Sequence, residues 1–228
     1  MKNVFKNRKI LVTAGPTWVP IDKVRVITNV FAGRTGYEIA KAAKKMGAKI
    51  TLLMGPGRIT LPVASQNRLE IIHFEYFDEL FGLVKRKVGS RKYDVIIHSA
   101  AVSDYKPVYR RSTKIRSCKK KLLIKCRPTI KIVDRIKRYD PSIFLIKFKL
   151  ELDTDEEELI KVGYKSMRES NADLMVVNSI YSSKKGYKTL IIDPQRRVYK
   201  VPSRRKLPEI LLGLIDERIN LPRRRTLC

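Results

Sequence analysis

Short apolar runs recur along the chain, and small or polar residues end each of them. The first run, Lys9–Ala14 (KILVTA), is closed by Gly15 and Pro16, which is typical of a buried strand that stops at a turn. Runs of the same kind predict further strands at 49–54, 69–74, 94–99, 142–150 and 173–178. Because these runs are continuously apolar rather than alternating, we expect most strands to be covered on both faces.

The segments between the runs have helical periodicity. In 34–47, small and apolar residues share one face, lysines occupy the other, and Gly47 is placed to end the helix. Thr154 and Glu157 form a capping-box pattern, which predicts a helix from there to about residue 170. Further helices are predicted at 77–88, 130–138 and 207–215, and a β-hairpin at 189–193 and 197–201.

Strands that alternate with helices indicate βαβ units around a mostly parallel sheet, so the predicted fold is α/β and Rossmann-like. The stretch 106–127, called the flap below, is irregular and strongly basic, and we expect it to be an insertion or hairpin outside the sheet. Ligands of such sheets bind at the carboxyl ends of the strands. That rule selects 15–17, 99–104 and 148–151 as candidate ligand-binding segments.

Length and composition favour one soluble domain, 1–228, with an apolar content of 43% that is sufficient for a core. We expect no signal peptide and no membrane span, because the first apolar run is too short for either. The three cysteines, Cys118, Cys126 and Cys228, show no CxxC spacing, which argues against a disulfide framework and a zinc site. The expected location is the reducing cytoplasm.

The net charge of +28 is the unusual feature of the composition. It fits a nucleic-acid-binding protein, an enzyme whose ligands are all phosphates, or a basic protein whose Lys and Arg residues fill solvated faces. The basic residues are spread along the chain and are not gathered in one tail or helix with interleaved aromatics. We therefore do not expect nucleic acid to be the main partner.

Three groups of residues are candidates for chemistry. Gly15, Gly33 and Gly36 flank a strand end and a helix start, where backbone amides can hold an anion, although glycines there often serve packing alone. The second group is 99–105 (SAAVSDY), where small residues leave room for a flat ring or a sugar and Asp104 can accept hydrogen bonds. In the flap, Lys114 can neutralise a triphosphate, or it can belong to a solvated basic hairpin.

Taken in order, these segments resemble the phosphopantothenate–cysteine ligase family, the second half of the bifunctional coenzyme A biosynthesis protein of many bacteria. The family pattern has a glycine-rich loop, Asp-x-Val-Arg, Asn, a Gly-x-x-Gly helix start, Ala-Ala-Val-x-Asp-Tyr, Lys-Ile, Phe-Lys-Leu-Glu and Asn-Ala-Asp. The corresponding residues here are Gly15–Thr17, Asp22–Arg25, Asn29, Gly33–Gly36, Ala100–Tyr105, Lys114–Ile115, Phe148–Glu151 and Asn171–Asp173, with Pro128–Ile130 at a helix start and Asn178 at a strand end. Pro16 replaces a glycine and Phe31-Ala32 replaces a pair of serines, so phosphate contacts in that loop can differ.

The resemblance implies a two-step reaction. The carboxylate of 4′-phosphopantothenate attacks the α-phosphate of CTP or ATP, and the amine of cysteine then displaces the nucleotide from the acyl carbon. It implies catalytic roles for Asn29 and Lys114, with Mg²⁺ accompanying the triphosphate and no metal site made by protein residues alone. The implied nucleotide contacts are Gly15, Thr17, Ser99, Ala100, Ala101, Asp104, Lys114, Pro128, Thr129, Ile130, Phe148 and Lys165, and the implied substrate contacts are Asn29, Gly33, Arg34, Gly36 and Ala101.

The resemblance also implies a homodimer in which the flap reaches the neighbouring subunit. Nothing in the chain resembles the flavin-dependent decarboxylase half, so we expect no FMN. A nicotinamide-dependent short-chain reductase is the alternative enzyme, because Tyr181 and Lys185 have Tyr-x-x-x-Lys spacing, but they lie in a Ser/Lys/Gly-rich loop where this spacing arises easily by chance. The choice between CTP and ATP stays open.

Overall fold

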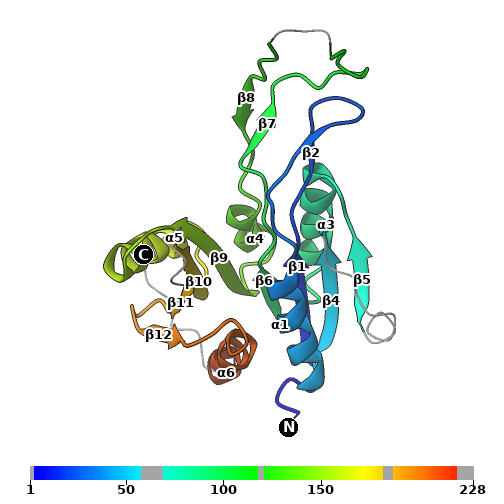
Figure 1. Cartoon of the computed structure of the whole chain (residues 1–228). Coiled ribbons are helices and arrows are strands. Elements are labelled where there is room, and N and C mark those ends of the chain that lie inside the picture. Colours follow the sequence, from blue (N-terminus) through cyan, green and yellow to red (C-terminus); the bar gives the residue numbers. More distant parts are fainter. Residues whose placement is uncertain (1–2, 58–68, 118–120, 182–186, 220–228) are drawn as a thin grey trace.

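The computed structural model describes residues 3–57, 69–117, 121–181 and 187–219. Among these, eight strands form one central sheet in the order β12-β11-β10-β9-β6-β1-β4-β5 (Figure 1). The six strands from β10 to β5 are parallel, and β11 and β12 add an antiparallel edge. Their bounds are β1 Lys9–Ala14, β4 Lys49–Met54, β5 Glu70–His73, β6 Val95–His98, β9 Phe144–Leu152, β10 Leu174–Ile180, β11 Tyr187–Ile192 and β12 Val198–Val201. The predicted mostly parallel α/β sheet and the predicted C-terminal hairpin are confirmed.

Helices cover both faces of this sheet. Their bounds are α1 Arg34–Lys45, α3 Phe77–Gly89, α4 Val133–Tyr139, α5 Glu156–Glu169 and α6 Leu207–Ile219. The apolar stripes of α1 and α6 pack on one face of the sheet, where Ile39 and Leu211 belong to the same core cluster. On the other face α3, α4 and α5 form a second core, with Leu80, Ile136 and Leu159 fully buried. The long apolar runs predicted from sequence are buried strands because both faces are covered in this way.

The ends of two helices test the local sequence signals. Gly47 follows the last turn of α1 with φ +95°, a left-handed conformation that favours glycine, as predicted. At the start of α5 the predicted cap is wrong by one residue. Asp155, not Thr154, is the N-cap, and its carboxylate accepts the backbone N–H of Glu158 at 2.9 Å. The Thr154 hydroxyl instead donates to the carbonyl of Leu152 at the end of β9, so it is engaged by the preceding strand.

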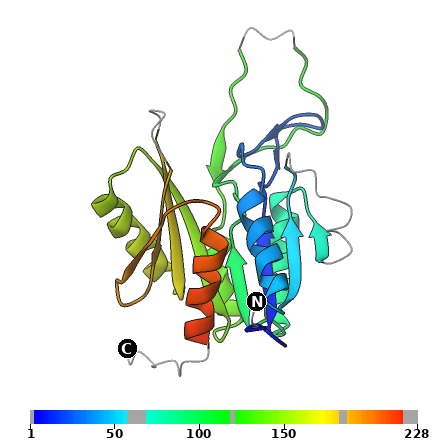
Figure 2. The ribbon, with the colours of Figure 1, turned by 60° about the horizontal axis from the view of Figure 1, so that its bottom comes forward.

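The flap begins directly after the carboxyl edge of the sheet. Its base is a short antiparallel pair, β7 Tyr105–Pro107 and β8 Cys126–Pro128. Figures 1 and 2 show the chain between them projecting away from the sheet, alongside the loop that carries β2 Val19–Pro20 and β3 Val26–Ile27. The sequence prediction of a basic insertion outside the sheet therefore describes this segment correctly. None of the described helices is long and apolar enough to span a bilayer.

Candidate functional site

A cavity of about 630 Å³ lies across the carboxyl edge of the sheet. It is built from the ends of β1, β6, β9 and β10, the start of α1, and the segment that leads into α4. Its position coincides with the reversal of strand order between β1 and β6, where parallel sheets of this type place their ligands. Its lining includes Gly15, Asn29, Gly33–Gly36, His98–Val102, Asp104, Thr129–Val133, Lys147–Leu150, Ser166, Asn178, Tyr187 and Arg204.

The first wall of the cavity is the N-terminus of α1. Gly33 precedes this helix with φ +79°, and a Cβ atom there would lie 2.7 Å from the backbone nitrogen of Gly15. One turn on, a Cβ on Gly36 would lie 2.4 Å from Oγ of Ser99. The glycines therefore let α1 approach the ends of β1 and β6. The N-cap residue, Gly33, has no side chain with which to cap the helix, so the first amides of α1 can bind an anion in the cavity.

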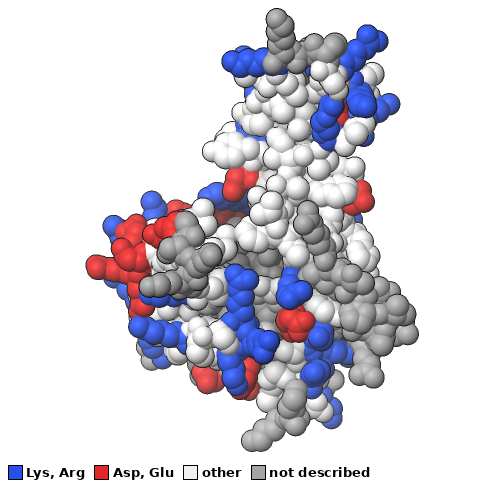
Figure 3. All heavy atoms as spheres, in the orientation of Figure 1, with Lys and Arg blue, Asp and Glu red and all other residues white. Residues whose placement is uncertain are grey.

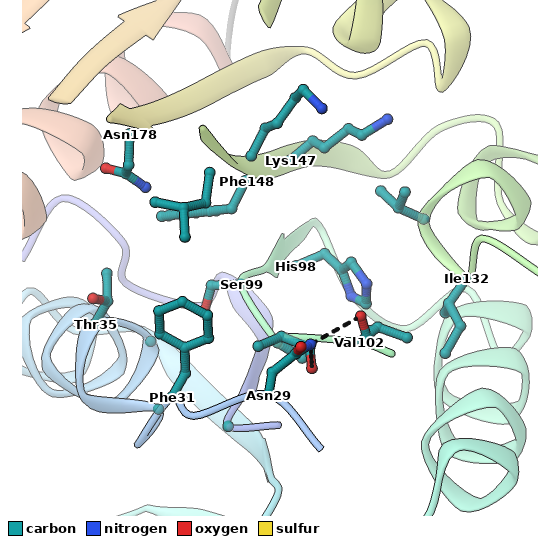
Figure 4. A pocket seen from close by; sticks show the side chains of 18 of the residues that line it. Asn29, Phe31, Thr35, His98, Ser99, Val102, Ile132, Lys147, Phe148 and Asn178 are labelled. Atoms are coloured by element: carbon teal, nitrogen blue, oxygen red, sulfur yellow. Dashed lines mark hydrogen bonds between the residues drawn. The ribbon is translucent and has the colours of Figure 1, made fainter. Parts of the chain in front are cut away.

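Asn29 spans the cavity floor next to the loop that follows β6. Its Nδ2 donates to the backbone oxygens of Ala101 at 3.0 Å and Val102 at 3.3 Å (Figure 4). Both amide hydrogens are thus used to hold this loop, and Oδ1 is the atom left to accept a hydrogen bond from a ligand. Asn29 therefore combines a structural contact with a place in the lining.

A second wall carries two basic residues from neighbouring strands. His98 and Lys147 are paired in register between β6 and β9, and both are buried. The Lys147 ammonium donates to the carbonyl of Ser166 at 2.9 Å and lies 3.6 Å from Oδ1 of Asp134. Nδ1 of His98 is hydrogen-bonded to the Thr13 hydroxyl at 3.0 Å.

Burial shifts the pKa values of both residues of this pair. It lowers the pKa of His98 to about 4, with a further contribution from the Lys147 charge, so the imidazole is neutral at pH 7. Burial also lowers the pKa of Lys147, whereas the carboxylate of Asp134 acts in the opposite direction. A buried cationic donor beside apolar Ile132 and Val133 gives this wall the chemistry to bind a flat, polar-edged group such as a nucleobase.

Asn178 faces the cavity from the end of β10. Its Oδ1 accepts hydrogen bonds from the hydroxyls of Tyr187 at 2.7 Å and Thr189 at 2.9 Å. The guanidinium of Arg204 lies over the Tyr187 ring, 3.7 Å from its centroid. Because Oδ1 is used in this way, the amide nitrogen of Asn178 is the atom that can donate to a ligand in the cavity (Figure 4).

Most of the site residues predicted from sequence meet at this cavity. Those that line it are Gly15, Asn29, Gly33, Arg34, Gly36, Ser99, Ala100, Ala101, Asp104, Thr129, Ile130 and Phe148. Four others do not line it. Thr17 is fully buried, and its hydroxyl forms a hydrogen bond with the hydroxyl of Ser103. Pro128 is exposed in β8. Lys165 is exposed on α5 and Lys114 is exposed on the flap.

Sequence reasoning missed His98, Lys147, Tyr187 and Arg204 as lining residues, and it noted Asn178 only as a motif residue. A usable signal was present for three of them. His98, Lys147 and Asn178 are each the first polar residue after the apolar run that begins their strand, and such positions lead to the carboxyl edge, where a parallel sheet binds its ligand. Of the pair considered for a reductase, Tyr181 donates its hydroxyl to the Thr154 carbonyl, and Lys185 lies outside the described residues.

Carboxylates that could bind a metal are sparse in the described part of the chain. No group of three or more His, Cys, Asp or Glu side chains comes together there. Asp104 is the aspartate of the sequence motif that lines the cavity. One carboxylate supports Mg²⁺ only together with ligand phosphates, which is the usual way that Mg²⁺ is bound at nucleotide sites.

The fold and the cavity define a class: Rossmann-like α/β proteins that bind a ligand at the point where the strand order reverses. Within that class the chain belongs to the family described as the DNA/pantothenate metabolism flavoprotein C-terminal domain, whose model matches residues 5–208. The family resemblance predicted from the ordered motifs is thereby confirmed.

Relatives with known names agree with this assignment. The chain is 32% identical over 215 residues to the coenzyme A biosynthesis bifunctional protein CoaBC of Thermococcus kodakarensis, covering 93% of this chain and 52% of that protein. It thus spans about half the length of this relative. Among solved structures, the DNA/pantothenate metabolism flavoprotein from Streptococcus pneumoniae is 29% identical with a TM-score of 0.81, covering 92% of this chain and 99% of that one. The C-terminal domain of CoaBC is 27% identical with a TM-score of 0.77, covering 95% and 97%.

Proposed function

We propose that this chain is a cytoplasmic ligase that joins 4′-phosphopantothenate to cysteine through an acyl-nucleotide intermediate. The observation that carries the proposal is the convergence of the ordered motifs on one cavity. Asn29, the glycines before α1, the Ala100-Ala101 segment and Asp104 are distant in sequence and share its lining. Membership of a family described by pantothenate metabolism supports the same reaction.

The proposed first step is attack by the substrate carboxylate on the α-phosphate of a nucleoside triphosphate. The new bond joins carboxylate oxygen to α-phosphorus, and the bond to the leaving pyrophosphate breaks. Both reactants are anions, so the site must neutralise charge as it develops on the phosphate. The free amides at the start of α1, Arg34 and the Lys147 ammonium supply positive potential inside the cavity.

In the second step the amine of cysteine, once it has lost a proton, attacks the acyl carbon. The amide C–N bond forms and the bond from acyl carbon to phosphate oxygen breaks, which releases the nucleoside monophosphate. Oδ1 of Asn29 is available to accept a hydrogen bond from the acyl-nucleotide or from the attacking amine. In the first step, Mg²⁺ held by Asp104 together with the triphosphate would supply additional charge neutralisation.

Lys114 requires a second subunit in this proposal. It is exposed on the flap and does not line its own chain's cavity. The flap also exposes apolar side chains that favour contact with another protein surface, among them Tyr109 at 83% and Leu123 at 78% exposure. We propose a homodimer in which the flap brings Lys114 to the nucleotide phosphates of the neighbouring subunit.

The test uses the purified chain with 4′-phosphopantothenate, cysteine, Mg²⁺ and CTP or ATP. Product formation by mass spectrometry together with one pyrophosphate per amide bond supports the proposal, and the more active triphosphate identifies the nucleotide. Without cysteine, an acyl-nucleotide of the expected mass should accumulate. Failure to form the amide with either triphosphate would overturn the proposed function. Oxidation of NAD(P)H by a small carbonyl compound, or reduction of NAD(P)⁺ by a small alcohol, would instead support the reductase. We continue to predict that the protein as purified contains no FMN, which its visible absorption spectrum tests.

A further inference from the structure

Asp22 stands out because a surface loop completely covers its side chain. The carboxylate has 0% side-chain exposure, although Asp22 lies in the loop between β2 and β3, outside the central sheet. Oδ1 accepts the backbone N–H groups of Val24 at 2.8 Å and Arg25 at 2.7 Å. Oδ2 accepts from the Arg25 guanidinium at 2.8 Å and from the backbone N–H of Ile115 at 3.0 Å. One carboxylate therefore connects its own loop to the flap.

The same loop binds the flap on both sides of Lys114. Before it, the backbone N–H of Arg111 donates to the carbonyl of Ile21 at 3.0 Å. After it, Nη1 of Arg25 donates to the carbonyl of Ile115 at 3.2 Å. Ile115 thus gives its N–H to Asp22 and its carbonyl to Arg25, so both polar atoms of the residue next to Lys114 are bonded. The Lys114 side chain itself stays exposed.

The charge of Asp22 persists throughout the working pH range. The N–H of Ile115, followed by that of Val24, holds the pKa of this carboxyl at about 2, below its usual value of 3.8. Its hydrogen bonds are therefore charge-assisted, which makes them shorter and stronger than bonds between neutral groups. An amide of the same size would present donors where Arg25 or Ile115 already donate.

We propose that Asp22 is the positioning residue for Lys114: it fixes the flap backbone at Ile115 so that the exposed ammonium is presented in one place for the phosphoryl-transfer step. This inference rests on the proposed function, and it gives Asp22 a positioning role toward Lys114, which lies far from it in the sequence. Asp22 touches neither substrate nor nucleotide in this proposal. Its whole contribution passes through Lys114.

The first test measures flap order without reference to activity. Hydrogen–deuterium exchange at the Ile115 amide should accelerate by about tenfold or more in Asp22→Asn, because the charged acceptor is lost. Exchange within β1 should not change, which shows that the sheet persists. Asp94→Asn is the matched control, since Asp94 likewise accepts from an arginine and a backbone N–H, those of Arg8 and Lys9. It should leave Ile115 exchange unchanged.

The second test is a double-mutant cycle on pyrophosphate release. Asp22→Asn should slow the wild-type enzyme by about tenfold or more but should add little to Lys114→Ala, because both changes remove the same contribution. The positioning role would be overturned if the rate losses of the two single variants multiply in the double variant, or if Asp22→Asn leaves exchange at the Ile115 amide unchanged. Full activity of Lys114→Ala would overturn it too, while amide formation by the wild type would still uphold the proposed function. If Asp22→Asn disrupts β1, Arg25→Met removes the bond to the Ile115 carbonyl and serves in its place.

Discussion

In the proposed function, Lys147 in the cavity and Lys114 on the flap both meet phosphate-bearing ligands, but the structure holds the two side chains by different means. Lys147 is buried in β9, and the strand register, a helix carbonyl and Asp134 determine its position. Lys114 is exposed, and its position depends on hydrogen bonds made by the residues around it. Changes in the sheet should therefore affect stability, whereas changes in the flap should affect rate and leave stability almost unaltered.

Figure 3 adds a difference in surroundings. On the face shown, lysines and arginines are scattered over the body, and several lie toward the far end of the flap. The scatter over the body fits a solvated basic surface better than a single nucleic-acid-binding patch. Four predictions test the comparison between sheet and flap, from the largest expected effect to the smallest.

Lys114→Ala should reduce pyrophosphate release by about 10²–10³, because a charge-assisted contact made mainly in the transition state is lost. The free energy of unfolding should change by less than about 0.5 kcal/mol, since the side chain is exposed. Steady-state kinetics and urea denaturation measure the two quantities. Lys125→Ala, another exposed lysine of the flap, should keep nearly full activity, and an equal loss in both variants would refute a specific role for Lys114.

Gly36→Ala should produce the opposite pattern, a loss of stability. The added Cβ would lie 2.4 Å from Oγ of Ser99 and 2.7 Å from Cβ of Ala14, so the start of α1 must shift. We expect a cost of about 3 kcal/mol, at the upper end for overpacking a core. Gly213→Ala is the control, because nothing lies within 4 Å of a Cβ at that helical position and the change should stabilise by about 0.4–1 kcal/mol. Equal stability of the two variants would contradict the close approach of α1 to β6.

The sequence predicted the sheet well because each strand carries its own signal. Continuous apolar runs identified the six parallel strands, and turn residues marked where they stop. The cap of α5 was misplaced by one residue because Thr154 and Asp155 both suit that position, and only the end of β9 decides between them. Local patterns cannot choose between adjacent residues when the choice depends on a tertiary contact.

The cavity was predicted in part for a related reason. Motif residues such as Asn29 and Ala101 are recognisable from their order along the chain, and they meet in the structure. The pairing of His98 with Lys147 depends on the register of β6 and β9, which no local pattern contains. The bond from Asp22 to Ile115 joins residues 93 positions apart and likewise becomes visible only in the fold.

The third prediction concerns His98, whose folded-state pKa of about 4 lies below the ordinary value of 6.5. As the pH falls, the unfolded state takes up the proton first, so stability present above pH 6.5 is lost toward pH 4. Between pH 7 and pH 5 this residue should account for a loss of about 2 kcal/mol. His98→Gln removes the titration, so urea denaturation should show a smaller loss of stability over that interval in the variant. Identical pH slopes would mean that His98 can be protonated in the folded protein.

The smallest effect should come from the excess positive charge. The Debye length falls from about 10 Å at 0.1 M salt to about 3 Å at 1 M, so exposed lysines and arginines lose their long-range influence over that interval. Both proposed substrates that carry phosphate are anions, and KM for each should rise by about threefold or more, while KM for cysteine should change much less. The contribution of Lys147 should persist, because a buried cation is screened far less than exposed ones. Initial-rate measurements across a salt series separate the two sources of charge. KM values for phosphopantothenate and nucleotide that stay constant would show that the excess positive charge, +28 for the whole chain, does not steer substrate and that the cavity alone attracts it.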